Sequence, residues 1–188
     1  MWARRSEFKK VIMDPPSFAD LVMRLISEAE QEGVILRAMG AAATYIRVRD
    51  NDVCLKLYEL LGRGREGEIY FTDLDLVSYR KLSKSIEKFF RSRGFEPDYY
   101  INAFFSDKRM VFYHPQGLFS IDVFFSPLEF SHKVDLGSDP RSGRLKLEKI
   151  TLTAADLLLL KLQIHEITRK DLVDAAVIDR KSTRLNSS

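Results

Sequence analysis

The alternation of apolar and polar residues divides the chain into helices and strands. Apolar residues recur every three or four positions in five segments, which is the spacing of a helix with one buried face. These segments are 14–33, 41–49, 78–94, 153–167 and 168–178. Ser17 and Thr153 are the expected N-caps of the first and fourth helices, and Gly33 stops the first.

Strand-like runs lie between these helices. Residues 34–40 form a short apolar run ending in Gly40, residues 69–77 form a second, and residues 109–125 predict a β-hairpin with a turn at 115–117. The charged, glycine-containing stretch 50–68 predicts a short helix and a flexible loop, inserted into the core. The phenylalanines around the hairpin are expected in the core, not on a stacking surface: Phe104, Phe105, Phe112, Phe119, Phe124 and Phe125.

Two aspartates, Asp73 and Asp75, interrupt the apolar run 69–77. Side chains alternate along a strand, so both carboxylates point to one face. Two negative charges so near each other repel and resist burial. The strand therefore lies at a wet edge, or a positive group belongs between the carboxylates. Asp122, between Ile121 and Val123, places a third carboxylate on a later strand.

Three carboxylates on two neighbouring strands can converge on one point. Mg²⁺ prefers such oxygen ligands and usually completes its shell with water and substrate phosphates. Gly40 ends the strand before the second helix, where a backbone without a side chain can approach a phosphate. The free N–H groups at that helix N-terminus also favour an anion.

Composition places the chain among ordinary globular proteins. At 188 residues it is one domain, or one domain with an appendage, and 45% of it is hydrophobic. The single cysteine, Cys54, cannot form an internal disulfide, so a cytoplasmic setting is expected. The longest purely apolar run is 157–160, which predicts no membrane span. The net charge of +3 is a weak signal for nucleic-acid binding.

The last ten residues differ in character from the rest. Helical apolar spacing stops at Ile178, and the segment 179–188 carries +2 of the net charge, from Arg180, Lys181 and Arg184 against Asp179. Its sequence resembles a peptide that recurs when sequencing-adaptor read-through is translated. We expect this tail to be non-native and the natural C-terminal helical part to be truncated; the alternative is an ordinary disordered terminus.

From Gly33 to Ile178 the chain resembles the DNA polymerase beta-like nucleotidyltransferase superfamily. Within it, the chain is similar to small prokaryotic nucleotidyltransferase-like proteins related to abortive-infection toxins. The resemblance is carried by the segments "LRAMGAAATYIR", "FTDLDLV", "SIDVFF" and "TAADLLLLKLQIHEITRKDLVDAAVI". It implies an α+β fold in which a mixed β-sheet is flanked by helices. Residues 1–150 would be the core and 151–178 the start of the helical part.

The resemblance also implies roles for individual residues. Asp73, Asp75 and Asp122 would be catalytic and would bind Mg²⁺ or Mn²⁺, and Asp122 would also help deprotonate the acceptor hydroxyl. The turn at Gly40 and Ala41 would bind the NTP triphosphate, with Lys161 contacting phosphate. Arg169 and Asp171, together with Lys170, would hold substrate or the helical packing.

Two functions remain open at this point. The first is a metal-dependent nucleotidyltransferase that moves a nucleoside monophosphate from an NTP to a small molecule, a protein or an RNA end. The second is a non-catalytic nucleotide- or partner-binding module on the same fold, with an antitoxin-like protein as one possible partner. Ala41 stands where the superfamily usually has Gly or Ser, which favours the second; the three retained acids favour the first.

Overall fold

The computed structural model of the chain describes residues 13–61 and 71–185. The described residues form an α+β fold with a five-stranded mixed sheet, a two-stranded hairpin and seven α-helices. The helices are α1 (Pro15–Gln31), α2 (Gly40–Val48), α3 (Asp52–Leu60), α4 (Ser83–Ser92), α5 (Tyr99–Phe104), α6 (Ala154–Leu162) and α7 (Arg169–Leu185). The described residues also form the 3₁₀ turns Arg80–Leu82 and Arg144–Lys146.

The main sheet has the strand order β1-β2-β5-β4-β3. Its strands are β1 (Arg37–Ala38), β2 (Asp73–Tyr79), β3 (Glu96–Pro97), β4 (Arg109–Tyr113) and β5 (Ser120–Ser126). The central strands β2 and β5 run parallel, and the other pairs are antiparallel. Strands β6 (Leu128–Glu129) and β7 (Lys133–Val134) form the separate hairpin. The predicted hairpin at 109–125 is therefore confirmed as β4 and β5.

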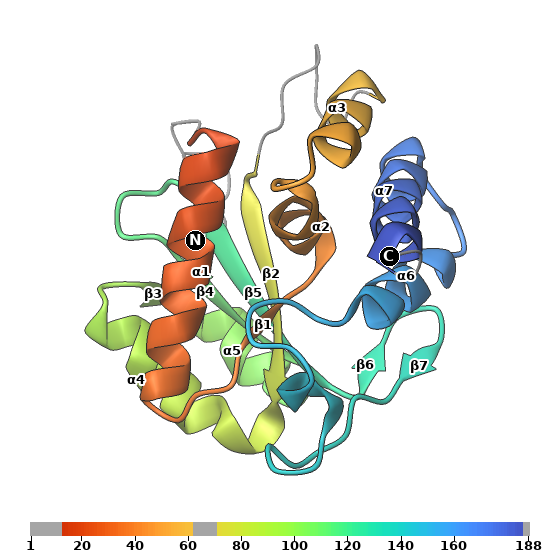
Figure 1. Cartoon of the computed structure of the whole chain (residues 1–188). Coiled ribbons are helices and arrows are strands. Elements are labelled where there is room, and N and C mark those ends of the chain that lie inside the picture. The colour runs from red at the N-terminus through yellow and green to blue at the C-terminus, as the bar shows by residue number, and fades with distance from the viewer. Residues whose placement is uncertain (1–12, 62–70, 186–188) are drawn as a thin grey trace.

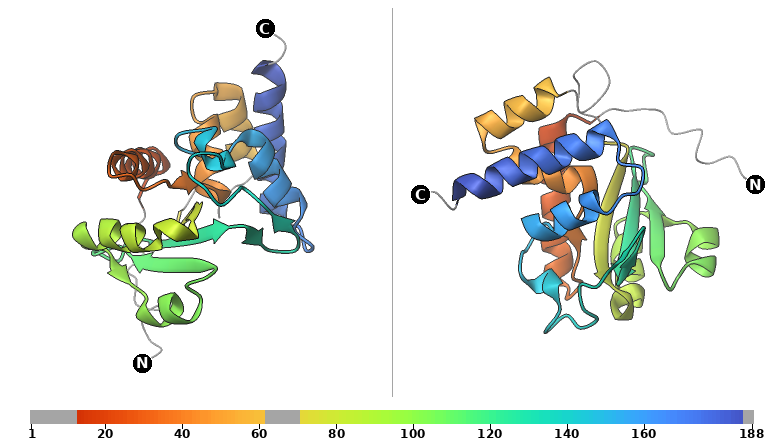
Figure 2. Two further views of the ribbon diagram at one scale, coloured as in Figure 1. Left: turned by 90° about the horizontal axis from the view of Figure 1, so that it is seen from below. Right: turned by 90° about the vertical axis from the view of Figure 1, so that its right-hand side faces the viewer.

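The sheet separates two unequal layers of helices. Figure 1 shows α1 and α2 in front of the strands, with α6 and α7 beside them. Both views in Figure 2 place α5 on the opposite side of the sheet from α2, α6 and α7. The thick layer buries an aromatic core: the Phe18 ring of α1 lies 4.8 Å from the Phe71 ring and 5.3 Å from the Phe119 ring. The N-terminal helices α1 and α2 and the C-terminal helices α6 and α7 therefore lie on the same side of the sheet.

Several predicted boundaries were wrong for local reasons. Asp14, not Ser17, caps α1: its Oδ1 accepts a hydrogen bond from the Ser17 N–H at 2.9 Å, with prolines at the first helical positions. The predicted helix 78–94 begins later, because residues 78 and 79 still pair with β5. Helix α6 ends at Leu162, five residues before the predicted end at 167. Thr153 is confirmed as its N-cap.

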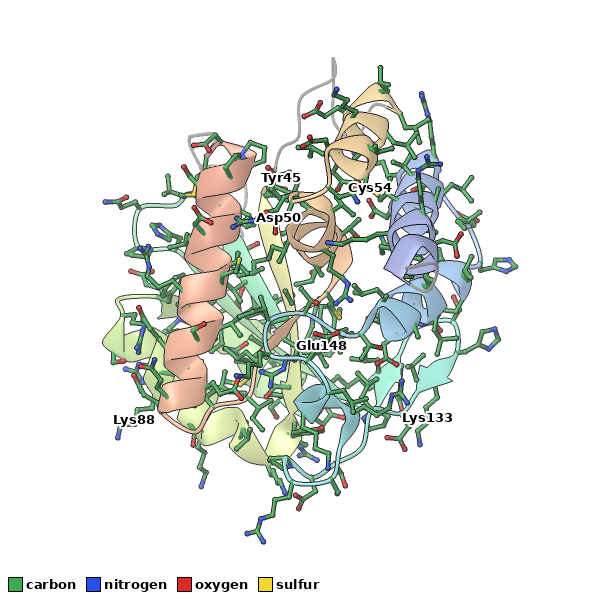
Figure 3. The ribbon with its side chains drawn as sticks, viewed as in Figure 1. Tyr45, Asp50, Cys54, Lys88, Lys133 and Glu148 are labelled. Atoms are coloured by element: carbon green, nitrogen blue, oxygen red, sulfur yellow. The ribbon has the colours of Figure 1, made fainter. Side chains whose placement is uncertain are left out.

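The aromatic and insertion predictions were right only in part. Phe112, Phe119 and Phe125 are buried, but Phe104 is 67% and Phe105 47% exposed. Phe104 is the last residue of α5 and Phe105 is its C-cap; this helix was not predicted, because six residues are too few to show an amphipathic repeat. In the insertion, the predicted short helix is α3, and the expected loop at 62–68 lies outside the described residues. Cys54 on α3 is fully buried, and Figure 3 marks its place.

The C-terminal part is helical, as predicted. Helices α6 and α7 pack against each other, and α7 also contacts α2 and α3. Helix α7 continues past Ile178 to Leu185, so part of the segment 179–188 is helical. The origin of that segment stays a prediction. Within the part of the chain that the structure describes, no helix is both long enough and apolar enough to cross a membrane.

Candidate functional site

The three aspartates lie on one face of the two central strands. Strands β2 and β5 pair in parallel with Asp75 opposite Asp122 and Asp73 opposite Ser120. The intervening residues face the core and are fully buried: Leu74, Leu76, Ile121 and Val123. Asp73 is exposed to solvent, whereas Asp75 is half-buried. The side chain of Asp122 is 17% exposed.

Asp75 is the electrostatic centre of this face. Burial, together with the nearby charges of Asp73 and Asp122, raises the pKa of the Asp75 carboxyl from 3.8 to about 7. Lys161 partly offsets this rise. A carboxyl with such a pKa is half-protonated near neutral pH and gains from any cation that replaces the proton. The ionised Asp75 carboxylate is therefore only weakly stabilised by the protein groups around it.

Gly40 touches the same carboxylate. The Met39 N–H donates to the Asp75 carbonyl oxygen at 2.9 Å, which fixes the start of α2 beside the middle of β2. A Cβ on residue 40 would lie 2.6 Å from Asp75 Oδ2. Gly40 also has a φ of +65°, in the region that favours glycine. Two independent reasons therefore require glycine here: backbone conformation and the space that Asp75 occupies.

The N-terminus of α2 opens next to Gly40. Met39 at the N-cap supplies no side-chain hydrogen bond. Gly40 and Ala41 are both partly exposed there. The first N–H groups of a helix have no partner within the helix and, with the helix dipole, favour an anion. The first N–H groups of α2, at Gly40 and Ala41, are therefore placed to attract an anion.

Lys161 lies between α6 and α7 and is only 15% exposed. Its Nζ lies 2.8 Å from Asp171 Oδ1 and 2.8 Å from Asp174 Oδ2. Burial works to lower the pKa of Lys161, but the charges of Asp174 and Asp171 outweigh it and raise the pKa above 10.5. Lys161 therefore joins the two C-terminal helices and also contributes positive charge toward Asp75.

The remaining predicted contacts are less central. Asp171 bonds to Lys161 and to Thr168, whose backbone N–H and hydroxyl both donate to Asp171 Oδ2. These contacts are those of helical packing. Arg169 is exposed in the first turn of α7, and no contact among the described residues joins it to the aspartates. Between substrate contact and packing, the observed bonds of Asp171 favour packing.

Sequence reasoning missed two charged partners of this region. Arg109 begins β4, and its Nη1 lies 3.3 Å from Asp122 Oδ1. Asp174 is fully buried against Lys161. The spacing of Asp171 and Asp174, three residues apart on a helix, was a signal that Asp174 belongs to the same cluster. The contact between Arg109 and Asp122 could be found only from the register of β4 on β5, in which Arg109 pairs with Phe124 and lies diagonally across from Asp122.

The side chains do not surround a single point. Among residues 13–61 and 71–185, no group of three His, Cys, Asp or Glu side chains is arranged to hold a metal ion. The backbone register nevertheless places Asp73, Asp75 and Asp122 on one face of two adjacent strands, with Asp75 directly opposite Asp122.

No family model matches the sequence, and no curated protein matches it.

The raised pKa of Asp75 predicts an unusual pH dependence of stability. In chelator, the folded state holds the Asp75 proton up to about pH 7, whereas the unfolded state releases it near 3.8. The free energy of unfolding should therefore fall as the pH rises through this window, by on the order of 2–4 kcal/mol. Urea unfolding from pH 4.5 to pH 8 measures it. Asp75→Asn should flatten the curve, and Asp50→Asn, on an exposed site, should not. A flat wild-type curve would contradict the prediction.

Proposed function

We propose that the protein is a metal-dependent nucleotidyltransferase, which moves a nucleoside monophosphate from an NTP to an acceptor hydroxyl. The observation that carries the proposal is the position of Asp75. Asp75 is two residues from Asp73 on β2 and directly opposite Asp122 on β5, and its carboxylate lies against Gly40 at the N-terminus of α2. Carboxylates, a glycine and a helix N-terminus in one place are what a metal–triphosphate complex requires. A purely structural role would not explain carboxylates that destabilise one another.

The residues present fit Mg²⁺ or Mn²⁺. All three candidate ligands are carboxylates, the hard oxygen donors that these ions prefer. The raised pKa of Asp75 is itself a sign that a positive charge would stabilise the site. Asp73, Asp75 and Asp122 would hold the ion. When bound, it would neutralise phosphate charge and orient the triphosphate.

The other groups of the site would position the reactants. Gly40 and Ala41 would present the N–H groups of α2 to the triphosphate, and Lys161 would contribute positive charge from α6. The acceptor oxygen would attack the α-phosphorus, forming a new P–O bond as the bond to pyrophosphate breaks. Asp122 would accept the proton of the hydroxyl, and pyrophosphate would leave. Most of the catalysis would come from positioning and charge neutralisation.

A second function is favoured by two observations. Ala41 carries a methyl group at the helix end where a phosphate would bind. Lys161 is already bonded to Asp171 and Asp174, so its charge is shared before any phosphate arrives. Both features suit a non-catalytic nucleotide- or partner-binding module, for which a toxin–antitoxin pair is one setting. Such a module would bind an NTP without transferring its nucleotide.

Thermal unfolding with each of the four NTPs, with and without Mg²⁺, tests the proposal. A nucleotide at about 100 times its Kd should raise the free energy of unfolding by about 2.7 kcal/mol, or several degrees in Tm. The shift should require Mg²⁺ and vanish in the Asp73→Asn/Asp75→Asn variant. Incubation of the preferred NTP should then release pyrophosphate once an acceptor is supplied.

The chain contains a matched control. Asp50 and Asp52 have the same spacing as Asp73 and Asp75 but are exposed. Asp52 is the first residue of α3, and Asp50, which Figure 3 labels, lies two residues before it. Asp50→Asn/Asp52→Asn should keep the full Mg²⁺-dependent shift. A shift that survives in the Asp73/Asp75 variant, or that no NTP produces, would rule out the proposed site. A shift without transfer to any acceptor would favour the non-catalytic module.

A further inference from the structure

A cavity of about 450 Å³ opens at the far end of the aspartate-bearing strand β5. Its volume is in the range of small-molecule sites. It is formed by the end of β5 and the start of β6, by the turn that leads into β4, and by Arg80 after β2. The lining residues are Arg80, Phe105, Asp107, Lys108, Arg109, and the continuous segment 124–130. None of the predicted site residues lines it, so its chemistry is still unassigned.

The cavity has flat apolar walls. Phe124 and Phe130 meet edge to face, with ring centroids 5.5 Å apart. Phe105 and Phe130 are each 47% exposed, which is a high value for rings of this size next to a cavity. The Arg109 guanidinium lies over the Phe124 ring, 6.0 Å from its centroid. Exposed aromatic faces beside a guanidinium are suited to stacking on a planar ring.

The cations of the cavity differ in how far they are already neutralised. Lys108 forms an ion pair with Glu129 at 3.2 Å, and Arg109 forms one with Asp122 at 3.3 Å. Arg80 is exposed, and its guanidinium makes no hydrogen bond or ion pair within the described parts of the chain. An anionic group entering the cavity would therefore meet Arg80 first. Arg109 could share its charge between this anion and Asp122.

Arg109 joins the cavity to the candidate catalytic face. It lines the cavity and contacts Asp122, the carboxylate expected to take the acceptor proton. Asp122 and Phe124 are two residues apart on β5 and so lie on the same face of the sheet. A ligand stacked on the Phe124 ring would therefore lie beside Asp122, the next side chain on that face of β5. The cavity is placed for the acceptor, not for the triphosphate at α2.

We propose that this cavity binds the acceptor of the reaction and that the acceptor contains a nucleotide unit. Its phosphate would contact Arg80 and Arg109, and its base would stack on Phe124 and Phe130. A ribose hydroxyl would then face Asp122. The role as an acceptor site rests on the proposed function, whereas binding of a nucleotide monophosphate in the cavity can be tested without it.

Calorimetric titration of the intact chain with AMP, in chelator, tests the binding. AMP should bind saturably, and adenosine and ribose 5-phosphate should each bind about tenfold more weakly or worse, because each lacks one half of the recognition. Arg80→Gln should weaken AMP about tenfold, the effect of losing a hydrogen bond to a charged group. Phe130→Ala should weaken AMP and adenosine but leave ribose 5-phosphate unchanged.

Two variants separate this site from the triphosphate site. Arg24→Gln removes the same charge from an exposed position on α1 and should leave AMP affinity unchanged. Asp73→Asn/Asp75→Asn should bind AMP as the wild type does. No AMP binding, or full binding by Arg80→Gln and Phe130→Ala, would overturn the proposal. Loss of AMP in the aspartate variant alone would also overturn it, since AMP would then occupy the triphosphate site.

The two proposals can fail separately. If AMP binds through Arg80 while no NTP stabilises the protein with Mg²⁺, the cavity is a nucleotide site and its role as an acceptor site is overturned. If an NTP binds with Mg²⁺ and AMP does not, the nucleotidyltransferase proposal stands and this cavity is not its acceptor site. If both bind together, pyrophosphate release should rise when AMP is added to the preferred NTP.

Discussion

A Lys161→Met variant is expected to lose about 3–5 kcal/mol of the free energy of unfolding. Asp174 is completely buried and Asp171 is 15% exposed, and both carboxylates contact Lys161 Nζ at 2.8 Å. Removing the lysine takes away the cation that contacts both of these neighbouring carboxylates between α6 and α7. The methionine has a similar shape, so little of the effect would come from a cavity. Urea unfolding at pH 7 measures the loss.

Two variants test the cause. Lys88→Met removes a lysine from the exposed side of α4, which Figure 3 places on the other side of the molecule from α6 and α7; it should change stability by less than about 0.5 kcal/mol. Lys161→Met/Asp174→Leu should recover much of the loss, because the buried charge disappears with its partner. If Lys161→Met behaved like Lys88→Met, the ion cluster would not stabilise the helix pair.

The pH range of this effect follows from the pKa shifts. The pKa of Lys161 is raised above 10.5, so its contribution is present below that value and is lost as the pH rises through the folded-state pKa. Burial works to raise the pKa of Asp171, but Lys161 and Thr168 lower it below 3.8, so its contribution is lost only as the pH falls through that lower value. The loss that comes from Asp171 and Lys161 themselves should therefore be nearly constant from about pH 6 to pH 9. Because Lys161 also lowers the pKa of Asp75, the total loss should grow as the pH rises through about 7 and Asp75 becomes charged.

Local periodicity was enough to predict the parts of the fold that depend on neighbouring residues. The alternation around Asp73 and Asp75 already placed both carboxylates on one face. The hairpin of β4 and β5 followed from two apolar runs around a turn, and Thr153 followed from its position before α6. The parallel pairing of β2 with β5, which brings Asp122 beside Asp75, was not predicted, because periodicity within a segment does not show which distant strand it pairs with.

The contacts that decide the chemistry depend on distant parts of the chain. Asp174 is buried because α7 packs on α6. The spacing of apolar residues in α7 does not show which helix it packs against. Arg109 contacts Asp122 because of a particular strand register. The exposed Phe105 and Phe130 form a cavity wall instead of core, since no element of the described structure covers them. The hydrophobic pattern predicts which residues prefer burial, but it does not predict which other segment will cover each of them.

A Gly40→Ala variant is expected to lose Mg²⁺-dependent NTP binding by about a hundredfold or more, about 2.7 kcal/mol. The new Cβ would lie 2.6 Å from Asp75 Oδ2, so the carboxylate must move. The φ of +65° adds a backbone penalty of about 1–2 kcal/mol for any residue with a side chain. The variant should therefore be less stable and also unable to hold the metal–triphosphate complex. NTP titration and urea unfolding measure the two effects separately.

Gly33 supplies the matched control for this argument. Its φ is +75°, close to that of Gly40, but a Cβ there would meet nothing within 4 Å. Gly33→Ala should pay the same backbone penalty and bind NTP and Mg²⁺ as the wild type does. In an Asp75→Ala background, Gly40→Ala should cost no more stability than Gly33→Ala, because the colliding oxygen is gone. Equal NTP binding by the two glycine variants would mean that the contact between Gly40 and Asp75 has no part in nucleotide recognition.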